Sequence, residues 1–141
     1  MAAVSKNDKF VSMELASDSF FEPGSADFSQ KAVGVLQLAA KEIIPLAEKK
    51  IRIEVEGYTD NVPIATAKYP SNWELSGARA SSVVRYLISQ GFPAEKIRAV
   101  GYADTHPKAP NEDTAGNPIV ANRGLNRRVV VKLLKPEVDD Q

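Results

Sequence analysis

The stretch at residues 51–80 reads IRIEVEGYTDNVPIATAKYPSNWELSGARA and contains the clearest structural pattern of the sequence. Apolar and charged residues alternate over its first part, which predicts a strand across 51–58. Turn-forming residues and two prolines then predict a loop. Ser71 followed by Glu74 matches a capping box, although Asn72 is an equally good cap, so a helix is expected to begin here. The stretch therefore indicates a strand, a loop and a helix of an α/β protein.

The same periodicities place further elements on either side. Ser29 can cap a helix that runs to about Lys49, and Pro45 within it predicts a kink or an early end. The helix that begins near Ser71 carries an apolar stripe and ends at Gly91. The other expected elements are strands over 10–15, 97–102 and 129–134, a long loop over 103–118 and a short helix over 119–125. Strands and helices in this order predict an α/β (α+β) two-layer sandwich, with a mixed sheet and its helices on one face.

Length and charge narrow the class of protein. The chain has 141 residues, which fits one domain, expected over 10–134 between a flexible N-terminal segment at 1–9 and a flexible acidic tail at 135–141. Lys and Arg total 18, and so do Asp and Glu, so a broad electrostatic attraction to nucleic acid is not expected. No apolar run reaches the about 18 residues of a membrane span, and the first residues lack the apolar segment of a signal peptide. The chain is therefore expected to be either a cytosolic protein or a soluble part of a longer protein.

Four polar residues lie where the strand ends and the helix begins. Asn72, Ser76 and Arg79 are spaced i, i+4 and i+7, which places them on one face of the helix. Asp60 follows the end of the strand, where α/β layers bind ligands, and the helix start adds unpaired backbone N–H groups. One carboxylate, one guanidinium and a row of amide donors are complementary to a zwitterion. Asp60 would bind its ammonium group, and Arg79 would bind its carboxylate through two parallel hydrogen bonds.

A purely structural role for these residues is an open alternative. Asp60 and Arg79 can pair with each other and fix the loop, and an exposed pair of this kind contributes about 0–1 kcal/mol. The residues alone slightly favour this alternative, since loop aspartates most often serve turns. Glu54 and Glu56 alternate to one face of the strand and are expected to form its solvated side rather than an acid–base pair.

The remaining candidate sites give little support for catalysis. The segment NRGLNRRV is basic, but Asn126 with Arg127 or Arg128 is expected to bind neighbouring carbonyls and carboxylates rather than phosphate. His106 is the one histidine of the sequence and stands in a loop, which argues against a serine–histidine–aspartate relay. No metal-binding spacing and no nucleotide-binding glycine motif occurs in the sequence. The sequence predicts a binding module that needs no metal or cofactor, rather than an enzyme.

Four segments of the chain carry a resemblance to a known family. They are TDN at 59–61, SNWELSGARASSVVRYL at 71–87, IRAVGYAD at 97–104 and NRGLNRRV at 122–129. In this order they resemble the OmpA-like peptidoglycan-binding domain, over about residues 10–134. Within that family, TDNVPI followed by YPSNWELS, with the longer loop between them, is similar to the MotB branch of flagellar motor stators. The resemblance implies a βαβαβ-type sandwich, in agreement with the order of elements above.

The resemblance implies non-catalytic binding of the diaminopimelate residue of the peptidoglycan stem peptide. In the family, an aspartate and an arginine hold the ammonium and the carboxylate of that residue, and these positions fall on Asp60 and Arg79. The peptidoglycan-binding residues that it implies are Thr59, Asp60, Asn72, Leu75, Ser76, Arg79 and, as a rim contact, Arg128. The free end of diaminopimelate is a zwitterion, so the resemblance favours the binding site over the structural alternative. The loop from 111 to 123 is longer than usual in the family, and its conformation is not predicted.

At the level of the whole protein, the resemblance implies an anchor that fixes a flagellar motor stator to the cell wall. Such an anchor is expected in the periplasm, as the soluble part of an inner-membrane-anchored protein. It is also expected to form a homodimer and to reach a stator partner subunit in the inner membrane through an N-terminal region. Because one fold can host several functions, a peptidoglycan anchor of an outer-membrane protein or lipoprotein is the alternative. A wall-cleaving hydrolase and a purely protein-binding module are less favoured hypotheses.

Overall fold

Within residues 2–6 and 9–136, which the computed structural model describes, five strands form one mixed sheet. The strands are β1 (Ala2–Lys6), β2 (Phe10–Ala16), β3 (Arg52–Tyr58), β4 (Ile97–Gly101) and β5 (Arg128–Leu134). They stand in the order β1-β2-β5-β3-β4, so the last of these strands along the chain occupies the centre. β3 and β4 are parallel, and the other neighbouring pairs are antiparallel.

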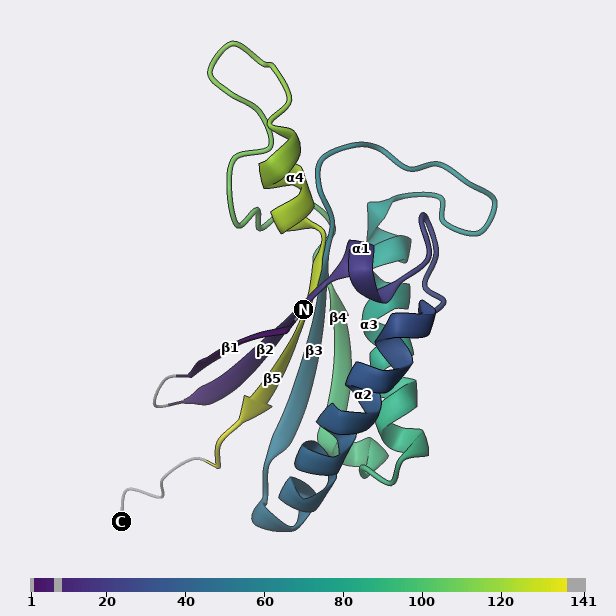
Figure 1. The fold of residues 1–141 in the computed structure, drawn as a ribbon, viewed down its shortest axis with the longest axis vertical. Helices are drawn as coiled ribbons and strands as arrows, with labels where there is room; N and C mark the ends of the chain where they lie inside the picture. The colour runs from purple at the N-terminus through teal and green to yellow at the C-terminus, as the bar shows by residue number, and fades with distance from the viewer. Residues whose placement is uncertain (1, 7–8, 137–141) are drawn as a thin grey trace.

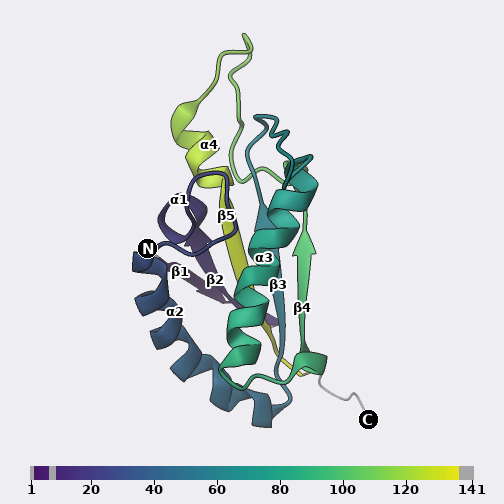
Figure 2. The same ribbon diagram turned by 90° about the vertical axis from the view of Figure 1, so that its right-hand side faces the viewer.

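Two long helices cover one face of this sheet, as Figures 1 and 2 show. α2 (Gln30–Ile43) continues into the 3₁₀ helix η1 (Ile44–Lys49), and α3 (Asn72–Ser89) follows β3 across a loop. The shorter helices are α1 (Ser17–Phe20), η2 (Ala94–Lys96) and α4 (Val120–Asn126). α4 and the long loop before it project from one end of the sheet, at the top of Figure 1. The predicted α/β two-layer sandwich with a mixed sheet is confirmed.

The ends of both long helices follow the predicted signals. Ser29 caps α2, and its Oγ accepts a hydrogen bond from the backbone N–H of Ala32 at 3.3 Å. α2 ends shortly before Pro45, which lies in the tighter 3₁₀ helix that follows, as expected for a proline that interrupts a helix. Of the two candidate caps of α3, the structure uses Ser71, whose hydroxyl accepts a backbone N–H of the first turn, so Asn72 is the first residue of the helix.

The N-terminal part of the sheet differs from the expectation. The segment expected to be flexible, residues 1–9, includes β1, which pairs antiparallel with β2 at the edge of the sheet. β1 owes its conformation to backbone pairing with that edge, which periodicity within a short segment cannot reveal. α1, a single helical turn directly after β2, is likewise not predicted by periodicity. Of the acidic tail expected at the other end, residues 137–141 lie outside the described residues.

The charged face of β3 also differs from its prediction. Glu56, expected on a solvated face, is 3% exposed, and its carboxylate accepts hydrogen bonds from the Tyr58 hydroxyl at 2.9 Å and from Lys132 Nζ at 3.1 Å. Glu54 forms an ion pair with Arg98 at 2.9 Å. The expectation of a solvated face is wrong because the neighbouring strands supply a cation for each carboxylate. These two carboxylates belong to cross-strand ion pairs.

The main apolar core lies between the sheet and the helices α2 and α3. Its fully buried side chains include Leu15, Leu36, Ile53, Val55, Val83, Leu87, Val129 and Val131. The apolar residues of α2 and α3 pack into this core. Within the described part of the chain, no helix has an apolar stretch long enough to cross a bilayer.

α3 packs directly on the backbone of β3 and β4 where two glycines leave room for it. A Cβ atom added to Gly57 on β3 would overlap the backbone carbonyl of Ser76. A Cβ atom at Gly101 on β4 would lie 2.7 Å from the backbone nitrogen of Gly77. Side chains do not tolerate such short contacts with backbone atoms, so both strands need glycine at this level. The close approach holds the first half of α3, with Arg79, near the ends of both strands.

Replacement of Gly57 by alanine is expected to lower the free energy of unfolding by about 3 kcal/mol or more, because the new methyl group meets a backbone carbonyl that cannot rotate away. Chemical denaturation followed by circular dichroism measures the change. Gly34→Ala is the matched control: Gly34 lies exposed on α2 with open space around it, so alanine there should raise stability by about 0.5–1 kcal/mol. Equal effects of the two substitutions would contradict the close packing.

Candidate functional site

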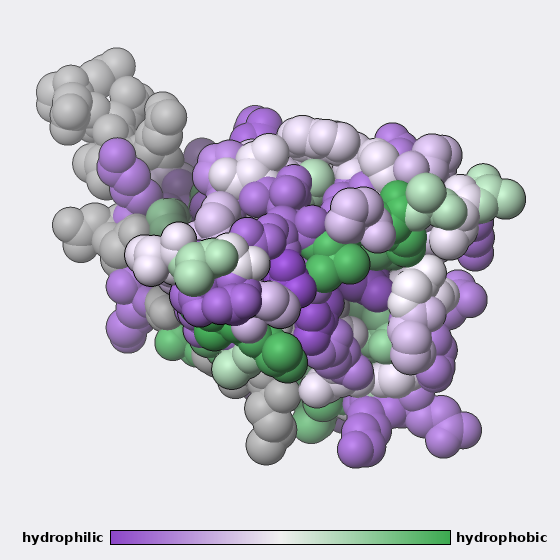
Figure 3. Space-filling model, turned by 90° about the horizontal axis from the view of Figure 1, so that it is seen from above, coloured by the Kyte–Doolittle hydropathy of each residue, from purple (hydrophilic) through white to green (hydrophobic). Residues whose placement is uncertain are grey.

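A cavity of about 400 Å³ opens at the end of the sheet where β3 ends and α3 begins. Its walls come from α1 and the loop after it, from the loop after β3, from the first half of α3 and from the residue before β5. Seen from above, this end of the molecule has hydrophilic residues across its middle and hydrophobic patches beside them (Figure 3). The lining residues are Ser17, Asp18, Phe21, Pro23, Gly24, Thr59, Asp60, Val62, Pro63, Ile64, Asn72, Leu75, Arg79 and Arg127.

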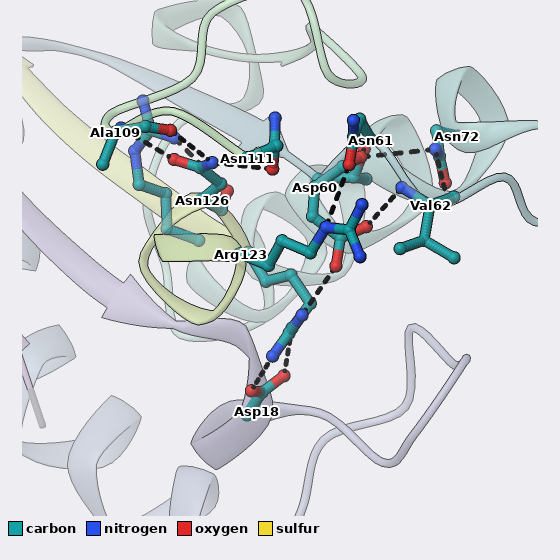
Figure 4. Close-up of polar contacts among 12 residues, drawn as sticks. Asp18, Asp60, Asn61, Val62, Asn72, Ala109, Asn111, Arg123 and Asn126 are labelled. Carbon is teal, nitrogen blue, oxygen red and sulfur yellow. Dashed lines mark hydrogen bonds and ion pairs between the residues drawn. The ribbon is translucent and has the colours of Figure 1, made fainter. Parts of the chain in front are cut away.

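Asp60 stands just beyond the end of β3 and is 7% exposed. Its Oδ1 accepts a hydrogen bond from the backbone N–H of Val62 at 2.9 Å, which closes a tight turn. Its Oδ2 accepts a hydrogen bond from Nη1 of Arg127 at 2.6 Å. Asn72 supports the turn from α3, since its Nδ2 donates to the carbonyl oxygen of Val62 at 3.1 Å (Figure 4). The carboxylate is therefore fixed in the cavity wall.

Arg79 enters the cavity wall from α3 and is 6% exposed. Its Nε donates a hydrogen bond to the backbone carbonyl of Ser25 at 2.8 Å, and its guanidinium carbon lies 5.2 Å from the centre of the Phe21 ring. Among the residues that the structure describes, no carboxylate forms an ion pair with Arg79. Burial lowers the pKa of Arg79, since it removes water from the charged form, yet an arginine stays charged in proteins. The cavity wall thus contains a buried cation that no described carboxylate pairs with.

The hypothesis that Asp60 and Arg79 pair with each other is wrong, because Asp60 pairs with a different arginine. Arg127 binds Asp60 through Nη1, and it binds Asp18 through Nε at 2.9 Å and Nη2 at 2.8 Å. The hydrogen bonds to Asp18, and then those to Asp60, raise the pKa of Arg127. The cavity wall therefore carries two carboxylates and two guanidinium groups, which sum to zero net charge.

Arg127, and not Arg128, is the arginine of the NRR segment that lines the cavity. Successive residues of an extended chain point to opposite sides, so the two guanidinium groups separate. Arg128 lies over the Tyr58 ring at 3.9 Å and donates a hydrogen bond to the carbonyl of His106 at 3.2 Å. Arg128 therefore makes structural contacts, whereas Arg127 is a cavity residue that sequence reasoning missed. The alternation of side chains along the final strand is the signal that separates the two.

Most of the predicted binding residues line the cavity, and two do not. The lining set is Thr59, Asp60, Asn72, Leu75 and Arg79, and the two outside it are Ser76 and Arg128. Ser76 is fully buried: its hydroxyl donates to the carbonyl of Trp73 at 3.1 Å and accepts the backbone N–H of Ala103 at 3.1 Å. It therefore ties α3 to the chain just beyond β4. Contact of each lining residue with a ligand stays a prediction.

Asn126 is fully buried and holds the long loop that precedes α4 (Figure 4). Its Oδ1 accepts the backbone N–H groups of Lys108 at 2.8 Å and Ala109 at 3.0 Å, and its Nδ2 donates to Asn111 Oδ1 at 2.9 Å. The prediction that Asn126 binds neighbouring loop groups is confirmed. A second polar cluster joins the same loop to the turn after β3 and consists of Asn61, Glu112 and Arg123.

The two carboxylates of the cavity wall bind Arg127 rather than forming a set of metal ligands. Within residues 2–6 and 9–136, no group of three or more His, Cys, Asp or Glu side chains is placed to hold a metal ion. His106 packs against the Tyr102 ring with centroids 4.8 Å apart and is not among the lining residues. The cavity is therefore suited to recognise a charged group through hydrogen bonds.

The chain is similar in sequence to a known family and to individual proteins. The profile of the OmpA family matches residues 20–120. The uncharacterized protein YtxE of Bacillus subtilis is 38% identical over 131 residues, which cover 92% of this chain and 50% of that protein. Motility protein B of Helicobacter pylori is 32% identical over 120 residues, which cover 84% of this chain and 44% of that protein. The chain spans about half the length of these relatives.

Solved structures share the fold. The periplasmic domain of Helicobacter pylori MotB matches with a TM-score of 0.82 at 28% identity, over 99% of this chain and 85% of that one. The cell wall anchor of the T6SS from Pseudomonas aeruginosa matches with a TM-score of 0.81 at 32% identity, over 96% of this chain and 88% of that one. The chain therefore belongs to the OmpA family, whose peptidoglycan-binding domains are non-catalytic.

Proposed function

We propose that this cavity binds the zwitterionic end of a diaminopimelate residue in peptidoglycan, and that it thereby anchors the protein to the cell wall. The main support for this proposal is that a carboxylate and a guanidinium group line the same cavity without pairing with each other. Asp60 and Arg79 both line the cavity, and each is fixed by its own contacts rather than by the other. An α-amino acid end has an ammonium and a carboxylate on one carbon, so it can bind both groups at once.

The two charges of the ligand have different partners. A carboxylate has about four lone-pair sites, and Asp60 uses one for the N–H of Val62 and one for Arg127, so it can accept a further hydrogen bond from an ammonium group. Arg79 uses its Nε for the carbonyl of Ser25, so its two outer nitrogens can bind a carboxylate through parallel hydrogen bonds. Because Arg79 is buried and lacks much of its hydration, such a partner stabilises it strongly.

The cavity suits a zwitterion better than a simple cation or anion. The charges of its wall already cancel, and a guest with no net charge preserves that balance. Apolar side chains such as Phe21, Val62 and Ile64 also line the cavity and can pack against the methylene chain of diaminopimelate. Two charge-assisted contacts are expected to give a dissociation constant of about micromolar to millimolar, so firm anchoring needs several copies on one wall.

The relatives support a role for this binding in a larger machine. One is a motility protein B, and a solved structure is that of a MotB periplasmic domain. The chain would therefore be the wall-binding part of a flagellar motor stator, located in the periplasm and forming a homodimer. An N-terminal region would anchor it in the inner membrane beside a stator partner subunit. The likeness to a T6SS cell wall anchor supports a second candidate, an anchor of another cell-envelope assembly such as an outer-membrane protein or lipoprotein.

Asp60→Asn and Arg79→Lys are each expected to reduce co-sedimentation with purified diaminopimelate-containing sacculi at least about tenfold, because each removes a charge or a bidentate contact. Asp104→Asn and Arg98→Lys are the matched controls, since they make the same chemical changes at exposed positions outside the cavity and should sediment like the wild type. Circular dichroism and thermal unfolding establish that each variant is folded. Unchanged sedimentation of both cavity variants would refute the site.

Chemical changes to the ligand should report which side chain binds which charge. Amidation of the free carboxylate of a diaminopimelate stem peptide is expected to weaken binding to the wild type about tenfold, but to change little with Arg79→Lys. Acetylation of the free ammonium should behave in the same way with Asp60→Asn. A stem peptide with L-lysine in place of diaminopimelate lacks that carboxylate and should bind like the amidated one. Calorimetric titration measures each affinity, and losses that simply add in all combinations would contradict the assignment.

The stator role predicts that residues 10–134 work inside a flagellar motor. A chimera that carries them in place of the periplasmic wall-binding domain of a motility protein B should restore swimming in soft agar. The same chimera with Arg79→Lys should not restore swimming, because it binds peptidoglycan more weakly. A chimera that binds sacculi but leaves the cells non-motile would favour the second candidate, an anchor of another assembly.

A further inference from the structure

The peptide segment formed by Ser25 and Ala26 is held by three side chains from outside its own loop. Nε of Arg79 donates a hydrogen bond to the carbonyl of Ser25 at 2.8 Å. The hydroxyl of Tyr69 accepts the backbone N–H of Ala26 at 3.2 Å. The hydroxyl of Ser82 donates to the carbonyl of Ala26 at 2.7 Å. This short segment therefore connects the guanidinium in the cavity wall to a phenol that does not line the cavity.

We propose that Tyr69 is a positioning residue for ligand binding: it fixes Ala26, and through it the Ser25 carbonyl that orients Arg79. Tyr69 is itself held firmly. It is 5% exposed and packs with Ala26 and Leu75 in a small apolar cluster separate from the main core. Its backbone N–H donates to Oγ1 of Thr66 at 2.9 Å, and its carbonyl accepts the N–H of Thr66 at 2.9 Å. The side chain of Tyr69 thus connects the loop after β3 to the loop after α1.

The direction of Arg79 matters because its side chain is long. A guanidinium fork binds a carboxylate well only when both outer nitrogens face it, and several rotatable bonds separate the fork from the helix. The hydrogen bond from Nε to a fixed carbonyl selects one orientation before the ligand arrives, which reduces the ordering cost of binding. If the Ser25 carbonyl moves, the fork keeps its charge but loses this orientation. The expected loss is therefore in affinity for a carboxylate-bearing ligand.

Tyr69→Phe removes the hydroxyl and keeps the ring, so it tests this step alone. In the free protein, the Nε–H signal of Arg79, identified by its absence in Arg79→Lys, should shift and exchange faster with solvent in Tyr69→Phe. The affinity for a diaminopimelate stem peptide should fall about three- to tenfold, the value of one lost hydrogen bond. Ser82→Ala should act in the same direction, and the double variant should lose less than the product of the two, since both act on one peptide segment.

Tyr86→Phe is the matched control. Tyr86 lies on α3, as Arg79 does, and its buried hydroxyl has no hydrogen-bond partner among the described residues. Removal of this hydroxyl should therefore leave the Arg79 signal and the affinity unchanged. All affinities are measured well below the unfolding transition, so that a change in overall stability does not alter the bound fraction. The proposal is overturned if Tyr69→Phe matches Tyr86→Phe in both readouts, or if its affinity falls while the Arg79 signal stays fixed.

The inference rests on the proposed function for its choice of ligand, and the two can fail separately. Wild-type protein that does not bind the diaminopimelate stem peptide would refute the proposed function. The Arg79 Nε–H comparison in the free protein would still show whether Tyr69 orients the guanidinium. A wild type that binds, with an Arg79 signal indifferent to Tyr69→Phe, would refute only the positioning role.

Discussion

The direct packing of α3 on the backbone of β3 and β4 is the constraint on which the site depends. At Gly57 and Gly101 no side chain separates helix from sheet, so the helix has one height and one rotation relative to the strand ends. Given that rotation, Ser76 faces the sheet while Arg79 faces the cavity. The chain leaving β3 must then turn beside the helix, and the turn at Asp60 forms another part of the wall. A cavity lined by charged side chains from both the helix and the loop after β3 therefore depends on how closely one helix lies on two strands.

The charges in that wall are balanced, but they are not paired one to one. Arg127 binds both carboxylates, Asp18 and Asp60, and Arg79 binds a neutral carbonyl. Burial of a cation without a counter-ion is costly, and a protein that needed only to fix a loop would gain more from a direct pair. In the proposed complex, a ligand carboxylate would relieve that cost at Arg79, and a ligand ammonium would add a partner to Asp60. The uneven distribution of partners therefore favours a binding site over a structural ion pair.

Recognition of the wall and membership of a particular machine are separate properties of this fold. The cavity is built from residues of the domain itself, whereas the machine is set by what the domain is attached to. The relatives reflect this division, since one solved structure is a MotB periplasmic domain and another is a T6SS cell wall anchor. In either assembly, the side chains of the cavity favour a ligand with one positive and one negative group. A motor assay and a wall-binding assay therefore answer different questions about the same chain.

Elements whose signals are local could be predicted from the amino-acid sequence. The caps at Ser29 and Ser71, the interruption at Pro45 and the alternation in β3 act within a few residues, so helices, strands and the α/β order were predictable. The sequence also predicted that Asp60 and Arg79 lie close together, and both line the same cavity. The partners became known only from the three-dimensional arrangement: which arginine binds Asp60, which strand supplies the lysine that pairs with Glu56, and which strand pairs with β1. Each of these contacts joins residues that are far apart in the chain. The contacts depend on the register between strands and on the position of α3 along the sheet, which no short stretch of sequence encodes.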